Sequence, residues 1–146
     1  MPNLATGDIE IKGKFNDIKN FLLNGIDEEN SFIEKRNEKE VWFENKNINL
    51  SSGIKGTSRC GISHVGSTIS INQADKNEEI SIMYYIEAAW NVYAEEFKEI
   101  SKKYNIDFFM TVEEPGSLFG KTIEIIEREI IQNETFYLEE EDEYWD

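Results

Sequence analysis

Alternation of polar and apolar residues is the main structural signal in this chain. In residues 8–14 the alternation places Ile9 and Ile11 on one face, which is typical of a half-buried strand. Similar runs recur along the chain, and residues 67–72 and 79–88 follow one another closely enough to predict a hairpin. The expected strands are residues 8–14, 31–36, 40–44, 67–72, 79–88, 106–113, 121–131 (one strand or two) and 135–138, with a turn at Asn133 before the last.

A helical pattern follows the first strand. Ile18, Phe21 and Leu22 fall on one face of a helix, which Asn16 would cap at its start and Gly25 would end. The sequence therefore predicts that the chain opens with a strand followed directly by a helix.

The clearest helical periodicity spans residues 91–104. Apolar side chains recur there at i, i+4, i+7 and i+11, which predicts one apolar stripe facing the core. The stripe consists of Tyr93, Phe97, Ile100 and Tyr104. Acidic residues near the start and lysines near the end suit the helix dipole, and Asn105 is the expected stop.

Two strand–helix units with further hairpins between and after them predict an α+β fold. We expect an antiparallel sheet with both helices on one face, in a ferredoxin-like sandwich that carries extra hairpins. The length of 146 residues fits one domain. We assign residues 1–138 to this domain and residues 139–146 to an acidic C-terminal tail.

The charge is unevenly distributed. Residues 1–94 hold 14 acids and 10 bases, a net charge of −4, whereas residues 95–146 hold 16 acids and 5 bases, a net charge of −11. Residues 46–73 contain no acid. This balance disfavours direct binding to nucleic acid or to an anionic membrane, both of which would repel the protein. It favours a basic protein surface as the partner, with electrostatic steering of the encounter.

Two features favour the cytoplasm. Cys60 is the only cysteine, so the chain cannot form an internal disulfide, as is usual in reducing compartments. The first residues lack a basic region followed by an apolar one, which would indicate a signal peptide, and no apolar run approaches the roughly 20 residues of a membrane span.

Several short motifs resemble the YubB-like ferredoxin-like domain, a family of small proteins from phages and plasmids. The similarity covers residues 1–25 and 84–125. It rests on Met1-Pro2-Asn3, the strand ending at Gly13, the apolar helix positions Ile18, Phe21 and Leu22, Ala88-Ala89-Trp90, Val112-Glu113-Glu114-Pro115-Gly116, and Phe119-Gly120. The resemblance implies a ferredoxin-like fold and an origin in a mobile genetic element, and it implies no activity. The resemblance also implies that Trp90 packs in the core as an anchor.

The one candidate for catalysis is a pair, Cys60 and His64, in a Gly- and Ser-rich stretch beside Arg59. A thiolate next to histidine and arginine could act as a nucleophile. One Cys and one His do not fill a tetrahedral zinc site, and the acidic run lacks the spacing of a calcium loop. We therefore expect no metal, no cofactor and no enzymatic activity.

Acidic and aromatic residues of the C-terminal third are the candidate binding residues. Carboxylates two positions apart on one strand face are about 6–7 Å apart, which resembles the spacing of phosphates along a nucleic-acid strand. Glu127 and Glu129 are expected to form such a pair, whereas the adjacent Glu113 and Glu114 should point to opposite faces. The candidates are Glu113, Glu114, Glu124, Glu127, Glu129, Glu139, Glu140, Glu141, Asp142, Glu143, Tyr144 and Trp145.

These features lead to one functional hypothesis and two alternatives. The hypothesis is an acidic inhibitor, encoded by a phage or mobile element, that mimics nucleic acid and occupies the basic nucleic-acid-binding surface of a host defence protein, as an anti-CRISPR protein would. The first alternative is a structural or accessory phage or plasmid protein that self-associates. The second is an enzyme that uses Cys60 and His64.

Overall fold

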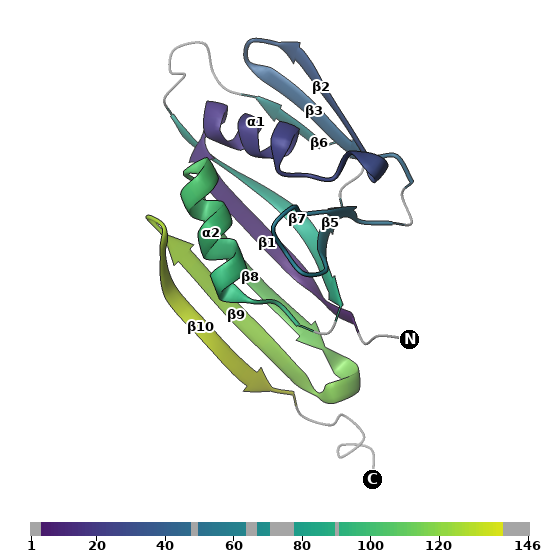
Figure 1. Ribbon diagram of the computed structural model, residues 1–146, viewed down its shortest axis with the longest axis vertical. Helices are drawn as coiled ribbons and strands as arrows, with labels where there is room; N and C mark the ends of the chain where they lie inside the picture. Colours follow the sequence, from purple (N-terminus) through teal and green to yellow (C-terminus); the bar gives the residue numbers. More distant parts are fainter. Residues whose placement is uncertain (1–3, 48–49, 64–66, 71–77, 90, 139–146) are drawn as a thin grey trace.

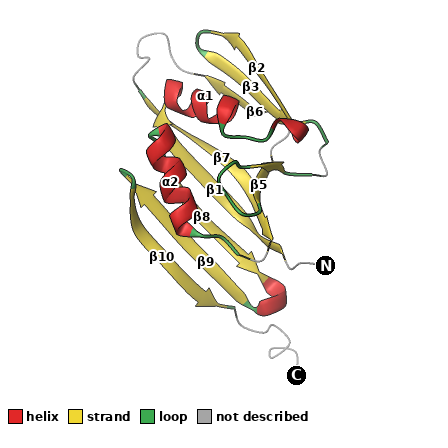
Figure 2. Cartoon of the chain, in the orientation of Figure 1, coloured by secondary structure: helices red, strands yellow, loops and turns green. Residues whose placement is uncertain are grey.

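The fold consists of a large antiparallel sheet, two helices on one of its faces and a small second sheet beside the first helix (Figures 1 and 2). The computed structural model describes residues 4–47, 50–63, 67–70, 78–89 and 91–138. It confirms the expected α+β class with a mostly antiparallel sheet and two helices. None of the helices within these described ranges has the length and apolar character needed to cross a membrane.

The large sheet contains β1 (Leu4–Lys14), β4 (Ser52–Gly53), β5 (Cys60–Ser63), β7 (Glu79–Ala89), β8 (Asp107–Glu114), β9 (Phe119–Ile126) and β10 (Glu129–Tyr137). The small sheet contains β2 (Ser31–Asn37), β3 (Glu40–Asn45) and β6 (Ser67–Ser70). The helices are α1 (Phe15–Asn24) and α2 (Ala94–Tyr104), with single 3-10 turns η1 (Glu28–Asn30) and η2 (Pro115–Ser117).

Strand β1 lies at the centre of the large sheet, whose order is β10-β9-β8-β1-β7-β5-β4. It pairs along its whole length with β7 and over residues 6–12 with β8, and both pairings are antiparallel. Its apolar residues Ile9 and Ile11 face the helices and are fully buried, as the alternation predicts. The polar residues between them therefore point to the opposite face of the sheet.

Helix α1 buries the three predicted residues, Ile18, Phe21 and Leu22. Its start differs from the prediction, because the N-cap position is Lys14, without a side-chain cap, and Asn16 lies inside the first turn. Gly25 ends the helix as predicted, with its N–H donating to the carbonyl of Phe21 at 2.7 Å.

Helix α2 buries Phe97, Ile100 and Tyr104 against the large sheet. Tyr93 was expected in this stripe, but it occupies the extended N-cap position and is exposed. Asn105 ends the helix as predicted, in the left-handed conformation with φ 57° and ψ 49°. Asparagine tolerates this conformation better than most residues do.

Aromatic side chains join the helices to the sheet. The Phe108 ring of β8 meets Phe21 of α1 edge-on at 6.0 Å between centroids and Phe97 of α2 at 5.2 Å. The small sheet joins the same core through Phe43, whose ring meets Tyr84 of β7 at 5.4 Å. One continuous core thus lies between the large sheet and everything packed on its helix side.

Two expected strand arrangements are wrong. The segment 67–70 does not form a hairpin with β7: β6 pairs with β3 in the small sheet, while β7 pairs with β1 and β5. Asn133 does not turn the chain, because β10 runs through it and pairs with β9 on both sides. A β-bulge between Ile130 and Gln132 is the irregularity in that strand. Trp90 and the tail 139–146 lie outside the described residues.

Candidate functional site: the open face of the large sheet

The face of the large sheet opposite the helices is the candidate site. We call it the open face and define it by the side chains of β1, β7, β8, β9 and β10 that alternate with the buried ones. Its registers place Asp8 beside Tyr85 and Thr111, and Glu10 beside Met83 and Phe109. Both rows continue across β9 to Thr122 and Glu124.

Carboxylates are spread over this whole face. The acidic residues that the strand registers assign to it are Asp8, Glu10, Glu79, Glu87, Asp107, Glu113, Glu124 and Glu134. The bases that β1 adds are Lys12 and Lys14, both at the end of the strand that leads into α1. The open face is therefore acidic along most of its length. At the end that leads into α1, Lys12 and Lys14 lie opposite Asp107 and Glu79, so the charges there balance.

Apolar side chains lie among these carboxylates. Met83 is 55% exposed and Tyr85 is 42% exposed, both on β7, and Leu4 of β1 is also exposed. The Phe109 ring of β8 lies beneath the Lys12 ammonium, with 5.3 Å between Nζ and the ring centroid. Exposed aromatic and methionine side chains surrounded by polar groups are typical of protein-interaction surfaces.

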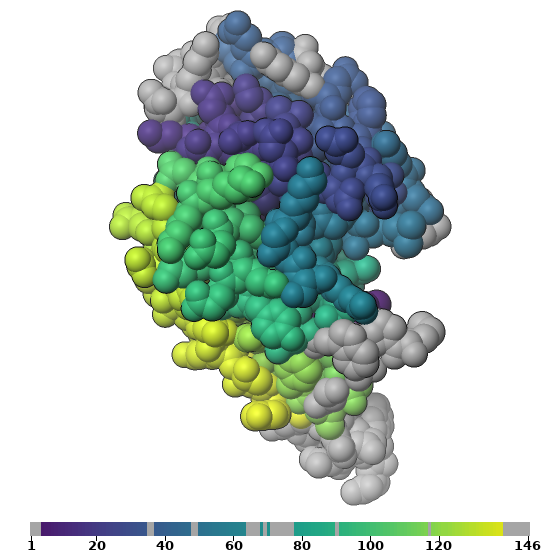
Figure 3. All heavy atoms as spheres, in the orientation of Figure 1, coloured from purple at the N-terminus to yellow at the C-terminus, as the bar shows by residue number. Residues whose placement is uncertain are grey.

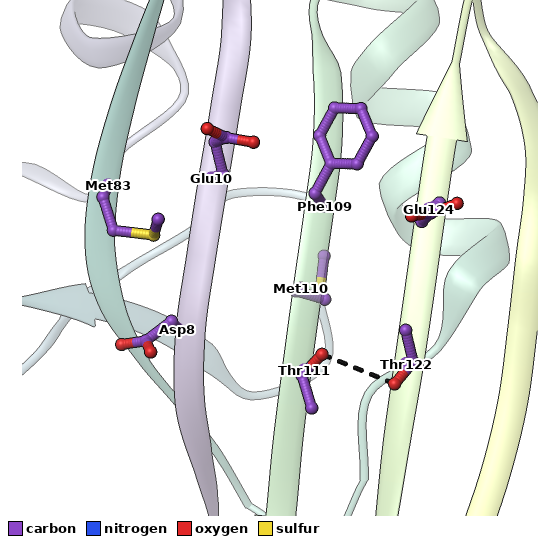
Figure 4. Close-up of a pocket in the computed structure, with 8 residues that line it drawn as sticks. All are labelled: Asp8, Glu10, Met83, Phe109, Met110, Thr111, Thr122 and Glu124. Atoms are coloured by element: carbon purple, nitrogen blue, oxygen red, sulfur yellow. Dashed lines mark hydrogen bonds between the residues drawn. The ribbon is translucent and has the colours of Figure 1, made fainter.

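A shallow depression of about 250 Å³ marks the middle of the open face. Figure 4 shows Glu10 of β1 between Met83 of β7 and Phe109 of β8, with Glu124 on the next strand. The Thr111 and Thr122 hydroxyls approach each other to 3.4 Å at its other side. The Ser81 hydroxyl donates to Glu10 Oε2 at 2.7 Å and so fixes the orientation of that carboxylate.

The structure brings two of the predicted binding residues to this face. Glu113 and Glu124 lie on it, on neighbouring strands β8 and β9. Glu114 points the other way, as predicted for an adjacent residue, and is only 3% exposed. Its Oε1 accepts a hydrogen bond from the Gly116 N–H, so it orders the turn after β8.

Glu127 and Glu129 do not form the expected pair on a strand face. Glu127 and Arg128 have φ values of 51° and 68° and form the turn between β9 and β10. Glu129 is paired with Ile126 next to the turn, and its carboxylate reaches towards the helix side, where Oε2 is 3.9 Å from the Lys98 ammonium of α2. Neither residue contributes to the open face. The remaining candidates, Glu139, Glu140, Glu141, Asp142, Glu143, Tyr144 and Trp145, lie outside the described residues.

The sequence prediction missed the acidic residues outside the C-terminal third. Asp8 and Glu10 of β1 are the main examples, since they occupy the centre of the open face. The signal was present in the alternation of residues 8–14, where both acids fall on the polar side of a predicted strand. What the sequence did not show was that this strand would lie between β7 and β8.

The candidate nucleophile is on the other side of the sheet. Cys60 is 4% exposed on β5, and burial, with a smaller effect of the Glu96 charge, raises the pKa of its thiol to about 11. This shift opposes formation of the thiolate that nucleophilic chemistry needs. His64 lies outside the described residues, and within the described ranges there is no group of three or more metal-ligating side chains.

Lys121 is a cation on the helix side. Its Nζ donates to the Val92 carbonyl at 2.8 Å, and burial lowers the pKa of its ammonium. It is thus held beneath the start of α2 and does not offset the charge of the open face.

Comparison of the chain with known family models, with characterised proteins and with solved structures gives no match.

Proposed function

We propose that this protein is a non-catalytic acidic inhibitor that binds the basic nucleic-acid-binding surface of a host defence protein. The observation that supports the proposal best is the open face, a sheet surface that no helix or strand of the described residues covers and on which carboxylates from several strands surround exposed apolar side chains. Such a surface would compete with nucleic acid for the same cations without any turnover.

The arrangement of the charges supports a partner rather than solubility alone. Acid that serves only solubility need not surround the exposed side chains of Met83 and Tyr85, as the carboxylates of the open face do. Clusters of this kind combine electrostatic steering with apolar anchors, which supply most of the binding energy at the centre of an interface. We therefore assign the contact surface mainly to β1, β7, β8 and β9, with Glu113 and Glu124 as the residues that overlap with the sequence prediction.

The resemblance to small phage and plasmid proteins supports a mobile-element origin. We propose a ferredoxin-like core made of α1, α2 and the strands in the order β8-β1-β7-β5, in which each neighbouring pair is antiparallel. In this assignment β9, β10 and the small sheet are additions. The protein would act in the host cytoplasm. The most specific form of the proposal names a CRISPR effector complex as the partner.

The test uses purified, guide-loaded CRISPR effector complexes and labelled target DNA. The inhibitor should reduce DNA binding, and its effect should weaken across a salt series from about 50 mM to about 500 mM, because salt screens exposed charge pairs. The variant D8N/E10Q/E124Q removes three open-face charges and should raise the inhibitory concentration roughly tenfold to a hundredfold.

The matched control is E28Q/E29Q/E95Q, which removes the same charge from exposed positions of η1 and α2 outside the open face. Its inhibitory concentration should stay within about threefold of the wild-type value, because the loss of net charge affects only the long-range steering of the encounter. Equal losses in both triple variants would show that net charge, and not this face, is responsible. Unchanged DNA binding at low salt with every effector complex would remove the anti-CRISPR proposal.

A further inference from the structure

The two edges of the large sheet differ in length. One edge is β4, a strand of two residues, and the other is β10, a strand of nine residues. A long open edge exposes backbone N–H and C=O groups that can pair with another strand, and most proteins block such an edge. Within the described ranges, β10 pairs only with β9.

The register identifies which backbone groups of β10 point outward. The Leu138 N–H donates to the Leu118 carbonyl at 2.8 Å, and the same register continues through Phe136 opposite Gly120 and Glu134 opposite Thr122. Hydrogen-bonded and non-hydrogen-bonded pairs alternate along an antiparallel ladder. The N–H and C=O groups of Asn133, Thr135 and Tyr137 are therefore directed away from β9.

These three outward residues are uncharged and exposed, and the Tyr137 side chain is 81% exposed. The bulge at Ile130/Gln132 limits the regular part of β10 to residues 132–137.

We infer that β10 is a self-complementary edge that pairs antiparallel with β10 of a second copy, with Thr135 opposite Thr135. In this register Asn133 lies opposite Tyr137 of the other copy, and every outward N–H and C=O of the three residues gains a partner. Glu134 lies opposite Phe136 rather than another carboxylate, so no like charges are directly opposed.

A two-fold axis at Thr135 would join the two large sheets into one and place both open faces on the same side. Only a few residues from each copy take part, so we expect a weak, concentration-dependent dimer of the small-interface class. Each copy has a net charge of −15, so added salt should strengthen the dimer by screening repulsion. Salt should weaken binding to a basic partner, and this opposite sign separates the dimer from the proposed inhibition, on which it does not depend.

The experiment is sedimentation equilibrium of the full chain at about 0.1 M and about 0.5 M salt. Thr135→Pro removes an outward N–H that β9 does not use, and it should weaken the dimer by about tenfold or more. Thr135→Ala keeps the N–H and should stay within about threefold of the wild type. Circular dichroism checks that each variant is folded.

Charge exchange tests the register without relying on proline. Thr135→Lys and Thr135→Glu should each be monomeric, since the register places each new charge opposite itself, and an equimolar mixture of the two should form a heterodimer. A wild type that stays monomeric at high salt, a dimer that persists in T135P and T135K, or a mixture that fails to associate would each overturn the inference.

Discussion

Glu96 of α2 accepts two hydrogen bonds from Ser58, a residue 38 positions earlier in the chain. The Ser58 N–H donates to Oε1 at 3.1 Å and its hydroxyl donates to Oε2 at 2.6 Å. This contact ties the loop between β4 and β5 to the first turns of α2. It is a long-range polar link on the helix side, remote from the open face.

Removing this link should loosen the loop. We expect Glu96→Ala to lower the free energy of unfolding by about 1 kcal/mol, a modest value because the hydrogen bonds are solvent-exposed. Urea denaturation gives this free energy. Glu95→Ala, one residue away and exposed, is the control and should change stability by less than about 0.5 kcal/mol. Equal losses in both variants would mean that the Ser58 contact contributes nothing measurable.

Two glycines of the large sheet should respond differently to alanine. A Cβ on Gly7 would lie 1.9 Å from the Thr111 carbonyl oxygen, which belongs to the backbone of the paired strand β8. A Cβ on Gly120 would lie 2.2 Å from Phe136 Cζ, the far end of a side chain that can rotate away. Gly7→Ala should therefore cost about 3 kcal/mol or more, and Gly120→Ala about 1 kcal/mol. Thermal unfolding of both variants checks the ranking, and the reverse order would contradict it.

Phe108 and Phe109 are neighbours in sequence on opposite faces of β8. Phe108 is fully buried between α1 and α2, so Phe108→Ala should lower the free energy of unfolding by about 3–5 kcal/mol. Phe109→Ala on the open face should cost about 1 kcal/mol or less and should leave circular dichroism unchanged. If F109A destabilised the fold as much as F108A, the open face would have to be covered in solution.

The raised pKa of Cys60 has a consequence for stability at high pH. Its ordinary pKa is 9.0 and the folded value is about 11, so between these values the unfolded chain binds fewer protons than the folded one. Stability must then fall as pH rises from roughly 9 to 11, by about 2–3 kcal/mol in total, whereas below pH 9 this group adds no slope. Urea denaturation of the wild type and of Cys60→Ala across this range should show that the free energy of unfolding falls less with rising pH in the variant.

Thiol labelling provides an independent check on Cys60. The rate of reaction with iodoacetamide should stay far below that of a free thiol at pH 8 and should rise steeply only at high pH. Rapid labelling at pH 7 would instead indicate an accessible thiolate and would revive the enzyme hypothesis. Denatured protein is the control for full reactivity.

Local patterns predicted the elements of this fold better than their pairing. Periodicity located the strand at 8–14 and, except for the exposed Tyr93, the predicted buried residues of both helices, because each depends on neighbours within a few positions. The alternation in 67–70 also indicated a strand correctly, yet its partner is β3 rather than β7. Choice of partner depends on contacts between distant segments, and one strand's pattern does not encode it.

The candidate site was predicted less well for related reasons. The turn made by Glu127 and Arg128 at positive φ carries none of the usual Gly or Asn signals, so the sequence does not locate it and predicts Glu127 and Glu129 as a pair on one strand face. The sequence prediction, which rests on the acidic last third, also misses Asp8 and Glu10. The distribution of charge along the chain does not show which strands will be neighbours in the sheet. The topology, not the composition, assembles the open face.

The central position of β1 also has a consequence for how the chain folds. Its neighbours begin at residues 79 and 107, so the middle of the large sheet forms only after two long loops have closed. Closing such loops lowers the entropy of the chain before the stabilising contacts form. Proteins rich in distant strand pairs therefore fold slowly, on the millisecond-to-second scale. During synthesis, β1 must wait until more than a hundred residues have been added before both of its edges are covered. The strand that contributes Asp8 and Glu10 to the open face is therefore the one exposed longest to misfolding and aggregation.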